Sequence, residues 1–395
     1  MPPKSLHISE YTVGWLCAIE EECYAASGML DFRHSDPYPA PTDQNDYMYG
    51  EICSHNVVIV KLPTGHTGKA GASRTAVLFS ESFPTIKIYL FVGIGGGMPW
   101  NSFENKPIHL GDVVVASPTR TGLPAIVYII DQPITQLVIA VDRVARRYNL
   151  GDSPFHDHLK LLSPENLARQ GVKYNLDKFN RPDSKYDILF GPKSKHHNGD
   201  DCSGCARSDI ARQSPPSDRN PEFHRGPIAS GDSVIQSGEE RDRLSEKYKG
   251  AICFEMEAAG VMFETHCLVI RGISDYADAH KGYKWHNYAA ATAAAFARQL
   301  LYDMPTTKKL EAKRLSAQPV TARASSSLRT PLPIAEAPDS GLINDPEEVP
   351  ASSAQLSNSA NTTGVSAPVV AWPLAPPTPP EGQKLPRLYK RDDKY

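Results

Sequence analysis

Apolar and polar stretches alternate along residues 11–303, and their lengths predict alternating strands and helices. Short continuous apolar runs predict buried strands at "YTVGWLCAI", "NVVIVKL", "IKIYLFVGI", "GDVVVAS" and "CLVIRGISD", with "AIVYII" as a further candidate. Helical spacing predicts helices over "EEECYAASGML", "GASRTAVLFSESF", "QLVIAVDRVARRY" and the alanine-rich "YAAATAAAFARQLLYDM". "GPIASGDSVI" and "AICFEMEAAGVMFE" each predict a strand that leads into a helix. Continuous apolar strands separated by helices predict an α/β protein whose sheet is covered on both faces.

Two regions do not follow this alternation. Residues from about 162 to 225 are polar and rich in Pro, Asn, Asp and Lys, which predicts a long surface insert before the next strand. Residues 304–395 are dominated by Pro, Ser and Ala, and no apolar period persists there, which predicts a disordered tail. We therefore expect one folded domain over residues 1–303. The polyproline character near residues 376–380 suits a partner with an aromatic-lined groove, although most such tails are plain linkers.

Composition narrows the class of protein. The 395 residues carry a formal net charge of −3, so charge gives no reason to expect nucleic acid as a partner. No apolar run approaches the roughly 20 residues that span a bilayer, and the N-terminus lacks the pattern of a secretory signal. Seven scattered cysteines favour reduced thiols over a disulfide framework. We expect a cytoplasmic location, and a nuclear one is also compatible with these features.

Polar residues gather where several of the predicted strands end. Glu20, Glu21 and Glu22 follow the first strand; capping and solubility explain the first two, whereas Glu22 is the best candidate to face a site. "GIGGG" lets a ligand approach the backbone closely, but it matches neither the dinucleotide fingerprint nor a P-loop. "FEMEAAG" and "ISD" end two later strands. Because ligands bind beyond strand ends in such sheets, we expect these groups to lie near one another.

The polar insert contains "HHNGDDCSGC", which raises the question of a metal site. The spacing of Cys202 and Cys205 can bind zinc, and His196 and His197 could complete a tetrahedral set. A second ligand pair at finger-like spacing is absent. The simpler interpretation is a polar loop with two thiols, so we expect no metal and keep these four residues as the candidate ligands.

The order of the motifs resembles that of the nucleoside phosphorylase/nucleosidase superfamily. "AIEEE", "TGHTGKAGA", "GIGGG", "GDVVV", "ASGD", "FEMEAAG" and "RGISDYAD" follow in that family's order over roughly residues 11–303, and both ends look most like fungal members. The family includes purine nucleoside phosphorylase, uridine phosphorylase and methylthioadenosine/S-adenosylhomocysteine nucleosidase. The resemblance implies a single-domain α/β fold in which helices flank a central mixed sheet. It also implies an enzyme that cleaves the N-glycosidic bond of a nucleoside.

The resemblance also implies roles for individual residues. Asp275 matches the acid that protonates the leaving purine, and a partly apolar setting would suit that task. Glu257 matches the glutamate that accepts hydrogen bonds from the ribose 2′ and 3′ hydroxyls. Glu22 matches the glutamate that holds the attacking water as general base. The remaining matches are to residues around the substrate: Met256 against the sugar, Val234 and Ile235 at the purine edge, and Ser274, Gly95 and Gly96 beside them.

Hydrolysis and phosphorolysis make different demands on the site. Phosphorylases of this family carry one arginine early in the chain and a second arginine two positions before the glycine-rich stretch. This chain has "AIEEE" at the first place and Phe91 at the second. Carboxylates repel a phosphate because both are negatively charged. We therefore expect hydrolysis of a purine nucleoside without a cofactor. A phosphorylase using phosphate remains the alternative within enzymes. A nucleoside-sensing or interaction module with weak or no turnover is the alternative outside them.

Two departures from the family pattern bear on activity. Ile94 stands where bacterial members often carry a hydroxyl, and the stretch after Ser117 is shorter than the usual substrate-covering segment. For partners, we expect a small-molecule nucleoside and a homo-oligomer, with no membrane and no nucleic acid.

Overall fold

The computed structural model describes residues 4–37, 42–117, 135–169, 176–197, 202–248 and 250–306. All of them belong to one of the two units into which the chain divides, Met1–Thr321. Of the tail predicted over residues 304–395, only 304–306 are described, and Met304 and Thr306 are buried. The candidate strand "AIVYII" and the segment directly after Ser117 lie outside the described residues. Among those described, none of the helices has the length and apolar character needed to cross a membrane.

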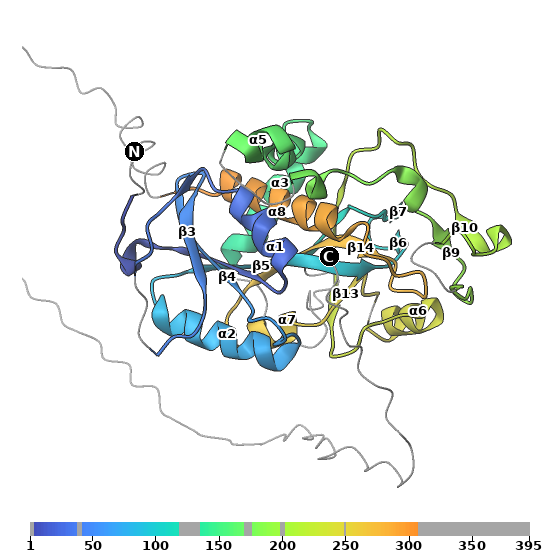
Figure 1. Cartoon of the computed structure of the whole chain (residues 1–395), viewed down its shortest axis with the longest axis horizontal. Coiled ribbons are helices and arrows are strands. Elements are labelled where there is room, and N and C mark those ends of the chain that lie inside the picture. Colours follow the sequence, from blue (N-terminus) through green and yellow to red (C-terminus); the bar gives the residue numbers. More distant parts are fainter. Residues whose placement is uncertain are drawn as a thin grey trace, which may run out of the picture. The chain divides into compact units, whose positions relative to one another are not determined.

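A ten-stranded mixed sheet forms the centre of this unit (Figure 1). Its four inner strands, β14, β5, β1 and β4, run parallel to one another. The pairings of β8 with β14 and of β3 with β4 are antiparallel. The strands of the sheet are β1 (Val13–Cys17), β2 (Phe32–Arg33), β3 (Tyr47–Ile52), β4 (His55–Lys61), β5 (Ile88–Gly97), β8 (Val113–Ala116), β11 (Phe223–Gly226), β12 (Ile228–Ser230), β13 (Cys253–Glu255) and β14 (Leu268–Asp275).

Helices cover both faces of the sheet, as the alternating pattern predicts (Figure 1). On one face the alanine-rich α8 (His286–Asp303) packs on β14 and β5, with α1 (Glu20–Gly28), α3 (Thr135–Asn149) and α4 (Phe155–Leu159) against it. On the other face α2 (Lys69–Ser82) packs against α7 (Ala258–Glu264). Each face has its own apolar core, one around Trp15 and Phe296 and the other around Phe79 and Phe91. The expected α/β class, with helices flanking a central mixed sheet, is confirmed.

The region expected as a polar insert consists of short elements. They are η2 (Lys160–Leu162), α5 (Pro164–Arg169), η3 (Leu176–Phe179), η4 (Ser184–Tyr186), β9 (Leu189–Phe190), η5 (Arg207–Asp209) and β10 (Ile210–Arg212). Strands β9 and β10 pair with each other in a separate two-stranded sheet. The other elements described are η1 (Ile8–Glu10), the pair β6 (Trp100–Asn101) and β7 (Lys106–Pro107), and α6 (Gly238–Lys247).

Three elements differ from the sequence-based expectation. The glycines of "GIGGG" lie inside β5 rather than in a loop, since β13 and β14 pair with them. The strand expected over "GPIASGDSVI" is only β12, and Val234 and Ile235 follow it outside any strand. The antiparallel β2 and β3 were not predicted, because they lie at the sheet edge and mix aromatic and polar residues.

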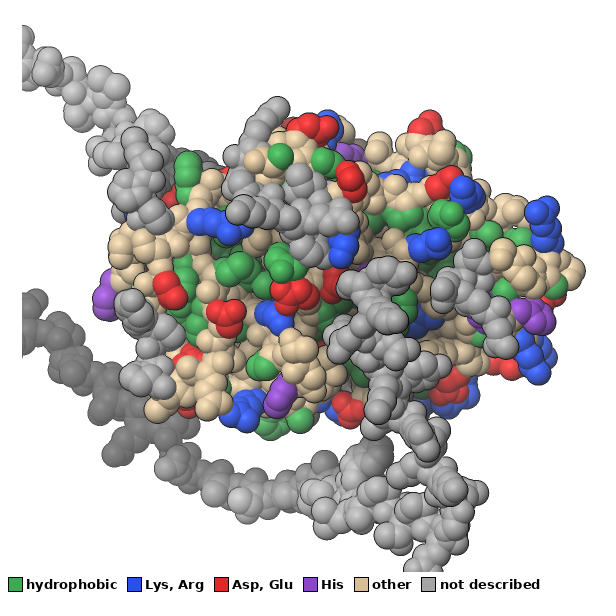
Figure 2. Space-filling view, viewed as in Figure 1, with side chains coloured by type: hydrophobic (Ala, Val, Ile, Leu, Met, Phe, Trp, Pro, Cys, Tyr) green, Lys and Arg blue, Asp and Glu red, His purple; other side chains and the backbone are tan. Residues whose placement is uncertain are grey.

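Figure 2 shows acidic and basic side chains interspersed over the face in view.

Candidate active site

The glycine-rich end of β5 is where the candidate residues come together. Gly93 pairs with Arg271 in the neighbouring β14, and Gly96 pairs with Asp275. A Cβ atom at Gly93 would overlap both Glu22 Oε1 and Arg271 Nη1. A Cβ atom at Gly96 would lie 2.9 Å from Asp275 Oδ1. Because these glycines have no side chains, the charged groups of Glu22, Arg271 and Asp275 can lie directly against β5.

Glu22 lies in the first turn of α1, buried, with its carboxylate turned back toward the strand ends. Its Oε2 accepts hydrogen bonds from the N–H groups of Ala18 (2.6 Å) and Ile19 (3.1 Å), and Oε1 accepts one from Ile94 (2.8 Å). Burial raises the pKa of Glu22 to about 7, although Arg271 and these backbone donors oppose the shift. Glu22 is thus a fixed carboxylate that can take up a proton near neutral pH.

The other two acids of "AIEEE" have different environments. Glu20 is exposed, and its Oε2 lies 3.1 Å from the ammonium group of Lys61. Glu21 is half-buried. Both lie in the first turn of α1, where the helix dipole favours acidic side chains.

Glu255 and Glu257 lie on either side of a change from strand to helix. Strand β13 ends at Glu255, and α7 begins at Ala258. Glu255 Oε2 accepts hydrogen bonds from the N–H groups of Glu257 (3.1 Å) and Ala258 (2.8 Å), so it caps α7. The same oxygen lies 2.7 Å from Arg271 Nη2, and both side chains are 1% exposed. Glu255 therefore serves the fold directly.

Glu257 has a more open environment. It is only half-buried, and its Oε1 accepts a hydrogen bond from the N–H of Gly68 (3.2 Å), at the start of α2. Burial, followed by the charge of Glu255, raises its pKa. Met256 beside it is also half-buried. Of the two glutamates in "FEMEAAG", Glu257 is the more accessible one.

Arg271 is a member of the site that the sequence reasoning did not identify. It is 1% exposed, pairs with Glu255, and its guanidinium carbon lies 4.1 Å from the centre of the Phe91 ring. Its charge acts on Glu22, Glu255 and Glu257. The signal available in the sequence was a single arginine inside an apolar strand. An arginine side chain is rarely buried in such a strand unless it is paired with an acidic group.

Asp275 ends β14 and is buried, but its carboxylate is surrounded by donors. Ser274 Oγ lies 2.9 Å from Oδ2, and the N–H of Ala277 donates to Oδ1 at 2.9 Å. Lys281 Nζ lies 3.0 Å from Oδ2, and its side chain is 31% exposed. Ser274 Oγ also lies 3.3 Å from the carbonyl oxygen of Gly95. The surroundings of Asp275 are therefore more polar than the preceding apolar strand suggested, and Lys281 is a second group that the sequence reasoning missed.

The segment "ASGD" reaches the same region from β12. The Ser230 hydroxyl accepts a hydrogen bond from the N–H of Ala259 in α7 (2.9 Å), and Asp232 pairs with Lys69 at 2.7 Å. Ile235 packs against an apolar cluster that includes Phe254, whereas Val234 is 49% exposed. The structure thus brings this segment to α7 and α2, but no described contact joins Val234 to the acidic groups.

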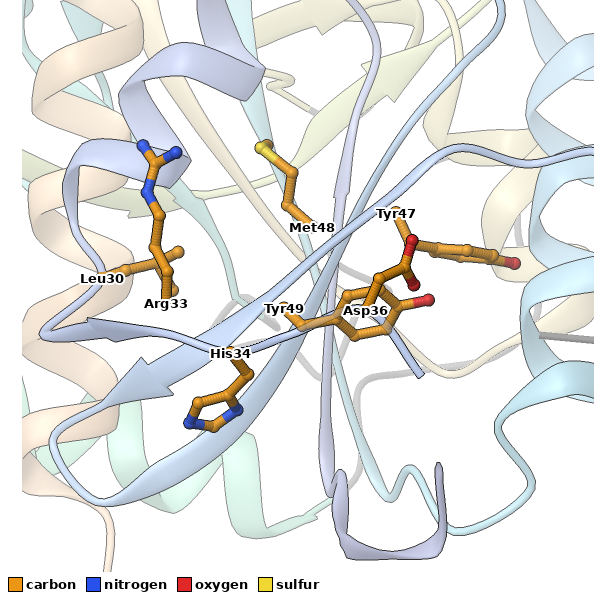
Figure 3. A pocket seen from close by; sticks show the side chains of 7 residues that line it. All are labelled: Leu30, Arg33, His34, Asp36, Tyr47, Met48 and Tyr49. Atoms are coloured by element: carbon orange, nitrogen blue, oxygen red, sulfur yellow. The ribbon is translucent and has the colours of Figure 1, made fainter. Parts of the chain in front are cut away.

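A separate cavity of about 190 Å³ lies beside β2 and β3 (Figure 3). Inside it, His34 Nδ1 is 3.2 Å from the Tyr11 hydroxyl. The cavity contains none of the predicted site residues. It is lined by Leu30, Arg33, His34, Asp36, Tyr47, Met48 and Tyr49.

Comparison with known proteins points to one superfamily. A family model described as the phosphorylase superfamily matches residues 178–303, the range that holds both Glu257 and Asp275. This part of the chain is therefore similar to the phosphorylase superfamily. A 5′-methylthioadenosine/S-adenosylhomocysteine nucleosidase of Mycobacterium tuberculosis is 26% identical over 304 residues, which cover 74% of this chain and 97% of that protein. Because that alignment covers nearly all of the mycobacterial protein, the likeness extends beyond residues 178–303.

Another protein to which this chain is similar is much longer than this chain. A nucleotide-binding leucine-rich repeat-like protein of the fungus Hyaloscypha variabilis is 37% identical over 318 residues, which cover 75% of this chain. The match spans only 30% of the fungal protein's own length. Among solved structures, the 5′-methylthioadenosine/S-adenosylhomocysteine nucleosidase of Neisseria meningitidis, in complex with methylthio-immucillin-A, aligns with a TM-score of 0.45 and 17% identity. That alignment covers 74% of this chain and 99% of the other.

Proposed function

We propose that this protein hydrolyses the N-glycosidic bond of a purine nucleoside or nucleoside derivative and releases the free base. The observation that carries the proposal is the position of Glu22. Its carboxylate is held by three backbone N–H groups beside Arg271, and its pKa is raised to about 7. A general base works best when its pKa lies near the working pH.

In this mechanism a water molecule beside Glu22 attacks C1′ of the sugar. Glu22 takes a proton from the water as the bond from C1′ to N9 of the base breaks, and the N–H groups of Ala18, Ile19 and Ile94 fix the orientation of its carboxylate. Glu257 accepts hydrogen bonds from the ribose hydroxyls, and Met256 packs against the sugar. Asp275 delivers a proton to N7, so that the bonding electrons leave with a neutral base rather than an anion. The net reaction consumes one water and yields free base and free sugar.

Asp275 needs a change before it can act in this way. In the structure its carboxylate is paired with the ammonium group of Lys281. Binding of the base has to displace this ion pair before the carboxyl group can carry a proton to N7. Because Lys281 is partly exposed, its ammonium group can move into solvent when the base binds.

The charges around Gly93 argue against phosphorolysis. One guanidinium, that of Arg271, faces the carboxyl groups of Glu22, Glu255 and Glu257. Its closest contact is already made with Glu255. A phosphate dianion at this place would meet more negative than positive charge, and at about 4 Å each like-charge contact costs about 4 kcal/mol at an effective dielectric constant near 20. Water is a better fit for this position than phosphate.

The experiment is to incubate the purified chain with adenosine, inosine, methylthioadenosine and ATP, each with and without phosphate, and to measure free base. Release that is independent of phosphate supports the proposal. Release only with phosphate would make the chain a phosphorylase. The named relatives act on methylthioadenosine and S-adenosylhomocysteine, so 5′-thio-substituted adenosines are the first substrates to test.

A second candidate function is a nucleoside-sensing module with little or no turnover. Two observations favour it: the ion pair that occupies Asp275, and the 37% identity to part of a fungal nucleotide-binding leucine-rich repeat-like protein. Tight binding of a nucleoside without base release, measured by calorimetry in the same samples, would support this function over hydrolysis.

A further inference from the structure

Three potential metal ligands converge in the part of the chain between β9 and β10. His196, Cys202 and Cys205 each offer one ligand atom, and these atoms all lie within 4.8 Å of one another. Cys205 is buried and the other two are half-buried. The N–H of Cys205 donates to the carbonyl oxygen of Cys202 (3.2 Å), which forms the tight turn that places both sulfur atoms on one side. These residues belong to the motif "HHNGDDCSGC", which has no role in the proposed reaction.

The chemistry of this set selects the kind of metal. Two thiolates and an imidazole are ligands that Zn²⁺ prefers, whereas Mg²⁺ and Ca²⁺ require oxygen ligands. With Zn–S near about 2.3 Å and Zn–N near about 2.0 Å, tetrahedral ligand atoms lie about 3.3–3.8 Å apart. Closing these three ligands around zinc would therefore require contractions of at most about 1.5 Å, which side-chain rotation can supply.

A fourth residue, distant in sequence, lies beside His196, although it is not a member of the converging group. His280 lies in the loop after β14, with its ring perpendicular to that of His196 and the two ring centres 5.4 Å apart. It stacks on Phe190 at 3.8 Å, and its side chain is only 4% exposed. Neither ring nitrogen of His280 has a hydrogen-bond partner within the structure. A buried imidazole without partners is costly, and a metal bond would satisfy one of its nitrogens.

We propose that His196, Cys202, Cys205 and His280 bind one Zn²⁺ ion. Asp278 Oδ1 lies 3.8 Å from His280 Nδ1, and a carboxylate in this position commonly orients a metal-bound histidine through its outer nitrogen. Nε2 is then the atom that faces the metal. His197, the other histidine of the motif, is exposed, and we assign it no role.

The zinc ion would connect the polar insert to the loop that follows Asp275. Two contacts already join them: Tyr276 donates a hydrogen bond to Asp187, and Arg212 donates one to the Tyr276 hydroxyl. His280 directly precedes Lys281, whose ammonium group pairs with Asp275. A metal bond at His280 would therefore hold the segment that carries Lys281 against the body of the insert. The site is structural, with four protein ligands and no open position.

The test uses the full chain, purified without chelators and with a reductant. We expect one zinc per chain by elemental analysis, and release of that zinc when the thiols are modified. Cys202→Ser, Cys205→Ser and His196→Ala should each lower bound zinc at least about tenfold, whereas the matched controls His197→Ala and Cys53→Ser should retain it. His280→Ala should lower the affinity about 10- to 100-fold while both thiolates still bind.

A spectroscopic measurement on the wild-type chain keeps the test decisive if the cysteine variants do not fold. Replacing zinc by Co²⁺ should give a sulfur-to-cobalt charge-transfer band and intense visible bands, as expected for tetrahedral cobalt with two thiolates. A Cys202–Cys205 disulfide in the reduced preparation, full zinc content in Cys202→Ser, or a wild-type chain that gives no charge-transfer band with Co²⁺ would each overturn the proposal. These readouts do not depend on nucleoside cleavage, so failure of the proposed reaction leaves this test unaffected.

Discussion

Glu22, Arg271 and Glu255 form a buried network in which the protein itself supplies the hydrogen-bond partners, whereas Glu257 has an open environment only two residues from Glu255. In the network, backbone N–H groups hold both carboxylates and the guanidinium also bonds Glu255, so the orientation of both carboxylates is set by the fold. At Glu257 the side chain is half-exposed, and a neighbouring backbone N–H donates to it. The difference teaches that neighbouring carboxylates in one motif can have different environments: the fold holds Glu255, whereas Glu257 is the one that the proposed function assigns to the sugar.

The largest expected effect is on the network. Glu22→Gln removes the proposed base, and base release should fall about 10²- to 10⁴-fold. Steady-state release of base from the best nucleoside substrate, measured without phosphate, checks this. The exposed Glu246→Gln on α6 serves as the control and should leave the rate unchanged. Full activity in Glu22→Gln, with or without phosphate, would remove Glu22 from the mechanism.

The two glutamates of "FEMEAAG" allow a direct test of the comparison. Glu257→Ala should raise KM about 10- to 100-fold, since a carboxylate that accepts charge-assisted hydrogen bonds from two hydroxyls is lost. Its free energy of unfolding should change little. Glu255→Ala should instead lower the free energy of unfolding by about 3–5 kcal/mol, because Arg271 is left buried without its partner.

Kinetics and denaturant titration of both variants, with Glu246→Ala as the control, separate the two effects. Equal changes in KM for Glu255→Ala and Glu257→Ala, at equal stability, would mean that the two carboxylates do not divide the work as described.

The pH dependence should report Glu22. Because the base must be ionised, kcat/KM should rise with pH through about 7. Stability should change in the opposite direction: the pKa of Glu22 is raised on folding, so its contribution is fully present below about 4.5 and is lost as the pH rises through about 7. Unfolding measured from pH 5 to 8 should show this loss in the wild type and not in Glu22→Gln. A kcat/KM that is flat across pH 6–8 would contradict the assignment.

The smallest expected effect concerns Asp275, which is buried like the network but is paired with a partly exposed cation. Lys281→Ala removes an ion pair that the base has to displace, so kcat/KM should rise about two- to fivefold, the equivalent of about 1 kcal/mol or less. Lys284→Ala, a few residues further along the chain, is the matched control. A loss of more than about tenfold in Lys281→Ala would show that Lys281 assists the reaction.

Much of the fold could be predicted from the sequence because the strands are continuous apolar runs. The runs before "EEE", "GGG" and "SD" became β1, β5 and β14, and the polar residues at their ends do meet at the end of the sheet. The edge strands β2 and β3 could not be found in this way, because their residues mix aromatic and polar types.

The site was harder to predict, for physical reasons that individual residues illustrate. Helix periodicity could not determine how far Glu22 is buried, since that depends on backbone donors from Ala18 and Ile94 on two different elements. Arg271 was hidden within a strand motif, and its role follows only from the pairing of β14 with β5. Lys281 and His280 act across a loop whose path carries no periodic signal.

The most direct test of the central claim is the identity of the sugar product formed in the presence of phosphate. The wild-type chain, given a purine nucleoside in a phosphate buffer made with ¹⁸O-labelled water, should yield free base and free sugar that carries ¹⁸O at C1′. A sugar 1-phosphate as the product, with no ¹⁸O at C1′, would contradict hydrolysis at the Glu22 site.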